Sequence, residues 1–224
     1  MANLQYVREI LKKNNPGTTI TQGFLRSDVL LTASNANITF PFLLAQSPAT
    51  AKCYPLNPAD GFCVCAMSMK IYKSADTAAP STANNIAKTI DFSYPSPGIF
   101  TKAGEAANLE SLYNGLLKVT INNNVIFSQY PAWKFRRVNT AQFGTQSATT
   151  FQTAPSEEQN GLANGLVPLE PTINMLGTWT MLFQLVPPAA LDLTGTTSTN
   201  YVSLILDGFL LQQGALSDKS FAGL

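Results

Sequence analysis

Three segments of the chain alternate apolar and polar residues with a period of two, the pattern of extended strands. In residues 62–73 the odd-numbered side chains define one face. The even-numbered side chains define the other face, which starts apolar at Phe62 and Val64 and then becomes polar. Two later segments, 178–185 and 201–207, repeat the alternation. We expect these apolar side chains to share one buried face within each segment: Cys63, Cys65, Met67, Met69 and Ile71; Trp179, Met181, Phe183 and Leu185; Val202, Leu204 and Leu206. The alternation predicts an all-β protein.

Shorter apolar runs at 24–32, 38–44 and 90–94 predict further strands. Residues 116–121 and 125–129 flank Asn122-Asn123-Asn124, which predicts a hairpin because asparagine tolerates positive φ. In all we expect roughly eight to eleven strands. Long neutral connections at 74–87, 139–167 and 187–200 favour Greek-key wiring over a simple meander. The predicted architecture is a jelly-roll sandwich or barrel, with a single barrel favoured and a compact double jelly roll as the alternative.

Two short helices interrupt this β pattern. Residues 4–13 place Leu4, Val7, Ile10 and Leu11 at helical spacing, and Asn14-Asn15-Pro16-Gly17 ends the helix. Residues 103–113 have a helix-forming composition. The chain therefore divides into an N-terminal amphipathic helix or arm at 1–15 and a β domain at 16–224. The first helix packs on its own domain or a neighbour, or touches a membrane or nucleic acid; the candidate contact residues are Leu4, Val7, Arg8, Leu11 and Lys12.

The chain is poor in charge. It has 14 Lys and Arg and 13 Asp and Glu in 224 residues, or 12%, against a usual fraction of about 25%. Asn, Gln, Ser and Thr must therefore supply most of the polar surface, and they desolvate at lower cost than ions. This favours a surface covered by neighbouring copies, and the alternative is a secreted or fibre-tip β-protein with a neutral skin. The net charge of +1 gives no field to attract nucleic acid or acidic lipid.

The chain contains no histidine. Ser–His–Asp and Cys–His catalysis are therefore excluded, no nucleotide-binding glycine motif is present, and a carboxylate-pair hydrolase is the enzymatic class that stays open. Cys53, Cys63 and Cys65 are too few for a zinc site without histidine, and we interpret the last two as buried, reduced thiols. The expectation is a non-enzymatic protein without cofactor or metal, made in a cytoplasm because no signal-peptide pattern opens the sequence.

One aromatic and basic segment is a further candidate contact site. Trp133 lies close to Arg136 and Arg137. A basic pair beside an indole can stack on a base or bind an anion. The alternative is a strand end that turns a corner, with the arginines making contacts between subunits.

The order of the predicted elements resembles a known family. A short N-terminal helix precedes the first strands, Leu112-Tyr113-Asn114-Gly115 opens the hairpin, and residues 131–138 (PAWKFRRV) follow it. This pattern is similar to the jelly-roll coat proteins of tailless icosahedral bacteriophages with an internal membrane. The resemblance implies a capsid subunit of the virion that forms trimeric capsomers, with its N-terminal helix toward the interior. The implied partners are copies of itself, other virion proteins and an internal membrane, with no specific nucleic acid. The alternative is a phage or cell-surface adhesin, a lectin-like β-sandwich that binds glycans.

Overall fold

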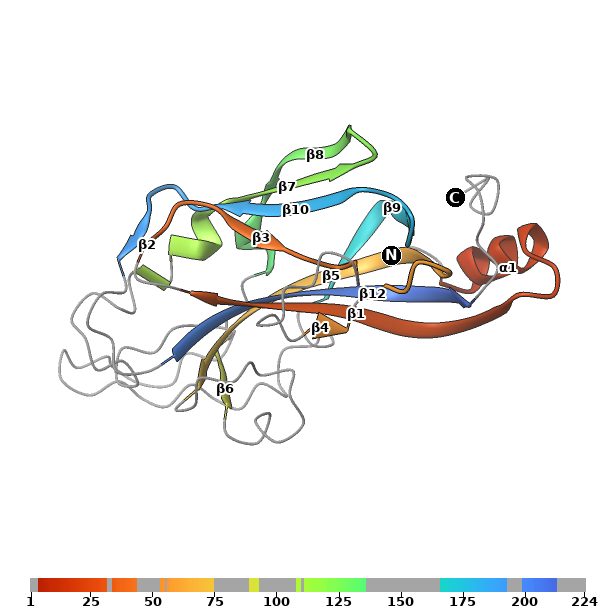
Figure 1. Ribbon diagram of the computed structural model, residues 1–224, viewed down its shortest axis with the longest axis horizontal. Coiled ribbons are helices and arrows are strands. Elements are labelled where there is room, and N and C mark those ends of the chain that lie inside the picture. Colours follow the sequence, from red (N-terminus) through yellow and green to blue (C-terminus); the bar gives the residue numbers. More distant parts are fainter. Residues whose placement is uncertain are drawn as a thin grey trace, which may run out of the picture.

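The computed structural model describes residues 4–31, 34–43, 53–54, 56–74, 89–92, 108–109, 111–135, 166–192 and 199–212. These residues form an all-β sandwich with one short N-terminal helix (Figure 1). In chain order the elements are α1 (Leu4–Asn14), β1 (Thr19–Leu31), β2 (Ser34–Asn35), β3 (Ile38–Phe40), β4 (Cys53–Tyr54), β5 (Gly61–Ser74), β6 (Thr89–Phe92), η3 (Leu112–Asn114), β7 (Leu116–Ile121), β8 (Asn124–Pro131), η4 (Ala132–Phe135), β9 (Val167–Leu176), β10 (Met181–Val186), β11 (Leu191–Asp192) and β12 (Thr199–Gln212).

The larger sheet is built around β12. Within the described residues its order is β4-β1-β12-β5-β6. β9 also pairs with β5, along a part of β5 that does not pair with β6. β12 is antiparallel to both β1 and β5 along nearly its whole length, from Thr199 to Gln212. Both neighbours are therefore fixed by backbone hydrogen bonds to a strand that comes near the end of the chain.

The smaller sheet has the order β3-β10-β7-β8 in the described part of the chain and lies above the larger one in Figure 1. β7 and β8 form the hairpin that the asparagines predict, with Asn122 at φ 48° and Asn123 at φ 64°. Positive φ at both central residues defines a turn whose twist matches that of the flanking strands. A separate short pair joins β11 to β2.

Four pairings among eight strands of the sandwich nest inside one another. Taking β1, β3, β5, β7, β8, β9, β10 and β12 in chain order, the first pairs with the last and the second with the seventh. The third likewise pairs with the sixth and the fourth with the fifth. Two further pairings, β12 with β5 and β10 with β7, join these four ladders into two sheets. Long connections therefore pass between sheets, as the mixture of long and short loops predicts.

A single main core fills the space between the two sheets. Leu204 and Leu206 of β12 and Met67 of β5 contribute to it from the larger sheet, and Phe183 of β10 from the smaller one. Phe183 packs edge-on against Phe42, with 4.9 Å between the ring centroids. Offset and edge-on aromatic pairs are favourable beyond the area that they bury.

The larger sheet is also covered on its outer face, at one end. There, residues of α1, β1, β5, β9 and β12 form a second group, called here the helix cluster: Val7, Leu11, Ile20, Cys63, Cys65, Leu176, Phe209 and Leu211. α1 lies at this end of the sheet in Figure 1. The helix buries Val7 and Leu11, one turn apart, as an amphipathic helix does.

A β-bulge at Cys65 decides which side chains of β5 face which cluster. Ala66 pairs with Asp207 and Val64 with Gly208, so Cys65 is an extra residue relative to β12. The register with β9 shifts at the same place. One extra residue exchanges the two faces of a strand beyond that point.

The prediction that five apolar side chains of this strand share one face is therefore wrong. Cys63 and Cys65 belong to the helix cluster. Beyond the bulge, the odd-numbered positions enter the main core: Met67, Met69 and Ile71. Strict alternation in the sequence conceals the bulge, because apolar residues occupy the odd positions on both sides of it.

Other predicted elements differ in extent. The first strand starts earlier than residue 24, and the run at 38–44 keeps β-pairing over β3 and at an isolated bridge from Leu43 to Leu56. β9 begins at the last residue of the predicted 139–167 connector and continues past it. β11 lies within the predicted 187–200 loop. Trp179 lies in the turn before β10, half-buried, while Met181, Phe183 and Leu185 alternate inward as predicted.

Several predictions fall partly or wholly outside the described residues. The 75–87 part of the first long loop and the 139–165 part of the second are not described, nor are residues 103–107 and 110 of the second predicted helix. Of that helix, 108–109 and 111 are helical, and η3 follows them. Leu109 and Leu112 are both buried in the main core, on the predicted apolar side.

The bulge makes Gly208 irreplaceable by a larger residue. A Cβ on Gly208 would overlap the carbonyl oxygen of Cys63, which is backbone and cannot move aside. We expect Gly208→Ala to lower the free energy of unfolding by about 3 kcal/mol or more, as overpacking does. Urea denaturation followed by circular dichroism measures this.

The matched control for this prediction is Gly23→Ala. Gly23 pairs with Gly208 across β1 and β12, but its Cβ would meet only the Cβ of Leu210, at 3.9 Å. We expect a change of less than about 1 kcal/mol there. Equal losses in the free energy of unfolding for the two substitutions would contradict this prediction. They would show that Gly208 is not required for the close approach to Cys63.

Candidate interaction surfaces

The predicted contact residues of the N-terminal helix separate into two groups. Val7 and Leu11 are buried in the helix cluster, so they hold α1 onto its own sheet. Leu4, Arg8 and Lys12 are exposed. Of the five predicted contact residues, these three are the ones that can meet another molecule while α1 is docked. Two members of the apolar stripe that the sequence suggested for such a contact, Val7 and Leu11, are already covered.

The thiols beneath α1 are free and buried, as the sequence predicts. The Cys65 thiol donates toward the carbonyl oxygen of Cys63 at 3.8 Å. The interaction between the two side chains, followed by burial, raises the pKa of the Cys63 thiol well above its ordinary value. The same side-chain interaction lowers the pKa of the Cys65 thiol, against an opposing effect of burial. The side chain of Cys53 is outside the described part of the structure.

Trp133 stands at an exposed corner on η4, directly after β8, and 61% of it is accessible to solvent. Three residues earlier in the chain, the ring of Tyr130 packs between Phe127 and Phe135, with centroid distances of 5.2 and 5.6 Å. The Lys134 ammonium lies 5.1 Å from the centroid of Tyr130, within the range of a cation–π contact. Burial raises the pKa of the Tyr130 phenol. The other two residues of this predicted site, Arg136 and Arg137, are outside the described residues.

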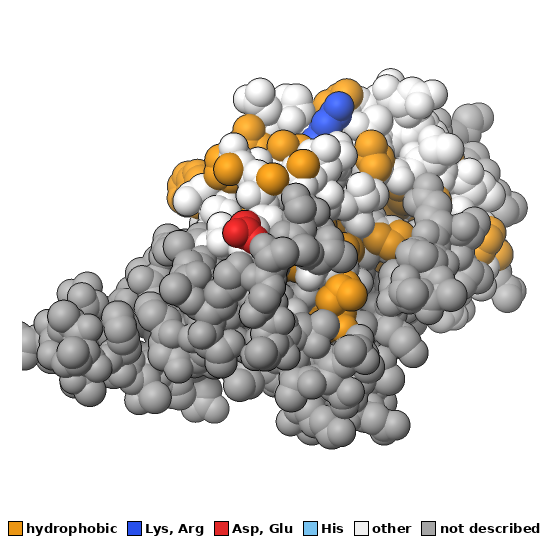
Figure 2. Space-filling view, turned by 60° about the vertical axis from the view of Figure 1, so that its left-hand side comes forward, with side chains coloured by type: hydrophobic (Ala, Val, Ile, Leu, Met, Phe, Trp, Pro, Cys, Tyr) orange, Lys and Arg blue, Asp and Glu red, His pale blue; other side chains and the backbone are white. Residues whose placement is uncertain are grey.

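The outer face of the smaller sheet is a surface that the sequence analysis missed. Leu116 and Val186 pair directly across β7 and β10, and Leu182 lies on the same phase of β10. Their exposed fractions are 39%, 38% and 38%. Val125 and Ile126 of β8 are exposed as well. Figure 2 shows hydrophobic side chains spread over the upper part of the molecule, where Figure 1 places this sheet, with few charged ones among them.

This face is also nearly free of charge. Of all the residues in β3, β7, β8 and β10, Lys118 is the one that carries a charge. It lies opposite Gln184, between the Leu116–Val186 pair and Leu182. The sequence contained this signal in the outward phase of β7 and β10, where Leu116, Leu182 and Val186 alternate with the polar Lys118, Thr120 and Gln184. The outward phase of a solvated antiparallel sheet is normally polar.

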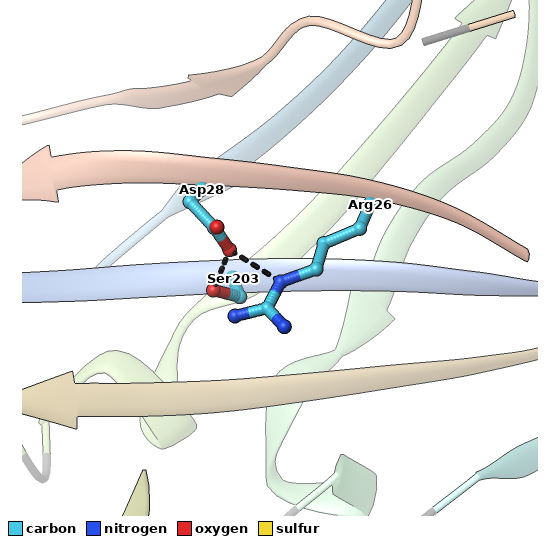
Figure 3. A network of polar contacts seen from close by, with 3 residues as sticks. All are labelled: Arg26, Asp28 and Ser203. Carbon is cyan, nitrogen blue, oxygen red and sulfur yellow. Dashed lines mark hydrogen bonds and ion pairs between the residues drawn. The ribbon is translucent and has the colours of Figure 1, made fainter. Parts of the chain in front are cut away.

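A polar network lies on the outer face of the larger sheet (Figure 3). Asp28 of β1 and Ser203 of β12 are directly opposite one another and buried. The Arg26 Nε donates to Asp28 Oδ1 at 2.9 Å, and the Ser203 hydroxyl donates to the same oxygen. The carboxylate is therefore paired with a cation and a hydroxyl, which compensates for its removal from water.

Neither metal binding nor a helical membrane span has a site in the described residues. No group of three His, Cys, Asp or Glu side chains there is placed to hold a metal ion. None of the described helices is long and apolar enough to cross a membrane.

Comparison of the chain with protein-family models, with curated proteins and with solved structures finds no match.

The Arg26–Asp28–Ser203 network should contribute to stability. We expect Asp28→Ala to lower the free energy of unfolding by about 3 kcal/mol, because it leaves a largely buried guanidinium without its carboxylate. Glu9→Ala, at an exposed position of α1, is the control and should change stability by less than about 0.5 kcal/mol. Thermal and urea denaturation measure both, and equal effects of the two substitutions would contradict a structural role for the network.

Proposed function

We propose that this chain is a structural subunit that assembles with copies of itself, and that the assembly is the capsid of a virus. The observation that carries the proposal is the outer face of the smaller sheet. It exposes Leu116, Leu182 and Val186 and carries one charge, that of Lys118. An antiparallel sheet that faces water on one side normally has a polar outer face. Exposed apolar surface of this kind marks contact with another molecule.

The size of this face indicates how it is used. Four strands about 4.8 Å apart, with about six residues each at 3.4 Å per residue, cover roughly 400 Å². A stable two-chain interface takes about 800 Å² from each partner. One such face therefore supports a weak contact that becomes stable when several contacts act together. This is the behaviour expected of a subunit in a closed ring or shell, where each copy has several neighbours.

The strand order supports a more specific version of the proposal. The nested pairing of first with last, second with seventh, third with sixth and fourth with fifth is what a long antiparallel hairpin gives when it is rolled into a single jelly roll. Jelly rolls occur both in capsid proteins and in lectins, so the fold alone does not select a function. The capsid proposal rests on the apolar face together with a chain of 12% charged residues.

An adhesin is the second candidate, and Trp133 is the observation that favours it. Trp133 is 61% exposed, and the next residue, Lys134, places its ammonium over the Tyr130 ring. Exposed aromatic rings with nearby polar groups are suited to stacking on the apolar faces of sugars. If the chain is an adhesin, we expect it to bind glycans. We expect Trp133→Ala to abolish that binding.

Sedimentation over a concentration series tests the capsid proposal. We expect trimers or larger assemblies, and we expect Leu182→Lys to weaken association at least ten-fold because it buries a charge in the contact. Thr178→Lys, in the exposed turn before β10, is the matched control and should leave association unchanged. Circular dichroism should show that both variants keep the native fold.

Two outcomes would contradict the capsid proposal. One is a wild-type chain that stays monomeric at every concentration, and the other is equal association of the two lysine variants and the wild type. Binding of the monomer to a glycan array, lost on Trp133→Ala, would then favour the adhesin.

A further inference from the structure

We propose that α1 is exchanged between copies: it leaves the sheet of its own chain and docks on the same place on a second copy. The proposal adds to the proposed function by naming one contact between subunits, and it rests on that function in taking the partner to be a second copy. The place is the helix-facing strip, defined as the six members of the helix cluster outside α1: Ile20, Cys63, Cys65, Leu176, Phe209 and Leu211.

The helix-facing strip is apolar, and α1 covers it in the structure. The six side chains are buried. They lie on the opposite side of the larger sheet from the main core, so removing α1 leaves that core in place. A bare strip would expose these six apolar side chains as one group, and a contiguous exposed apolar patch marks a site of contact with another molecule. Since Val7 and Leu11 already fit this strip within one chain, the α1 of any other copy fits it equally well.

The outward face of α1 suits either location. Arg8, Glu9, Lys12 and Lys13 are exposed. Lys12 and Lys13 lie in the last turn, where positive charge is favourable to the helix dipole. An 11-residue helix is only marginally stable alone in water, so α1 is expected to stay helical chiefly when it is docked. Its docked state is thus favoured whether the strip belongs to its own chain or to a neighbour.

The connection between α1 and β1 is short and is built as a hinge. It consists of Asn15, Pro16, Gly17 and Thr18. Hydrogen bonds from Asn15 to Leu11 and from Thr18 to Asn15 hold the turn, and Gly17 takes a φ of 85°. A Cβ on Gly17 would meet no described atom within 4 Å, so there is space at this position of the turn.

The proline of the hinge also limits the helix. A proline disfavours helical backbone in the residue before it, and α1 ends at Asn14, before Asn15 and Pro16. Fully extended, four residues span about 14 Å. A short hinge is a condition under which an element is exchanged between identical chains.

Hinge length is the variable that tests the exchange. Deleting Pro16 and Gly17 prevents α1 from folding back onto its own sheet but still allows it to reach a neighbour. Inserting Gly-Ser-Gly-Ser between Gly17 and Thr18 makes folding back easier. All variants carry Cys53→Ser, so that maleimide labelling reports on Cys63 and Cys65, which α1 covers. The same four-residue insertion between Asn122 and Asn123, at the tip of the β7–β8 hairpin, is the control.

We expect the deletion variant to associate at least ten-fold more tightly than the wild type while its two thiols stay protected from maleimide. The hinge insertion should weaken association at least ten-fold, and the hairpin insertion should leave it unchanged. Leu11→Ala in the deletion variant should reverse the association and speed labelling at least ten-fold, because it removes the side chain that α1 buries most completely.

A monomeric deletion variant with reactive thiols would overturn the exchange, since α1 would then be undocked and not captured by a neighbour. If the deletion variant does not fold, the insertions still decide, because association that is the same for both insertions and the wild type would also overturn it. These outcomes are separable from failure of the proposed function. A wild type that is monomeric at every concentration contradicts the capsid, whereas assembly that ignores hinge length contradicts only the exchange.

Discussion

The pairing of β12 with both β1 and β5 is the contact on which the rest of the structure depends. β12 comes last among the described strands and β1 first, so their ladder joins parts of the chain that are furthest apart in sequence. The three inner pairings are nested between these two, so each closes a shorter loop than the outer pairing does. Non-local pairing of this kind forms slowly, because the entropy of closing a long loop is lost before the contacts are gained. The close approach at Gly208, which only glycine permits, lies on this central strand.

The bulge at Cys65 lets one strand serve two apolar clusters. Without the extra residue, the odd-numbered side chains of β5 would all face the same way. Either the main core or the helix cluster would then lack the apolar side chains that β5 contributes to it. With it, Cys63 and Cys65 pack under α1 while Met67 and its neighbours fill the sandwich. The docking of the N-terminal helix is therefore a consequence of a local irregularity in a strand far along the chain. The thiols are apolar packing groups there, and their perturbed pKa values follow from burial and from their contact with each other.

The sequence predicts the elements whose local signal agrees with their tertiary setting. The first helix, the β7–β8 hairpin and the strand around residues 62–73 are confirmed, because periodicity and turn chemistry point the same way. β9 was missed since Pro168 and Pro171 interrupt its pattern, and a proline within a run of residues argues against a strand. The bulge was missed because a period-2 pattern carries no mark of an inserted residue. The apolar outer face of the smaller sheet was missed because Leu182 and Val186 alternate with core residues, and only the pairing of β7 with β10 shows that they meet Leu116.

The two proposed contacts lie on opposite faces of the sandwich, and this arrangement has a geometric consequence. The helix-facing strip is on the outer face of the larger sheet, and Leu116, Leu182 and Val186 are on the outer face of the smaller one. A copy that meets one neighbour through each face can extend an assembly, whereas a copy with one self-complementary face stops at a dimer. Low charge favours both contacts, because a neutral face brings no like charges together when identical chains meet. The charge of the sandwich is instead placed where it is compensated, as at Asp28 between Arg26 and Ser203. If both proposed contacts form, each copy has neighbours on two opposite faces, which is what the proposed assembly of copies requires.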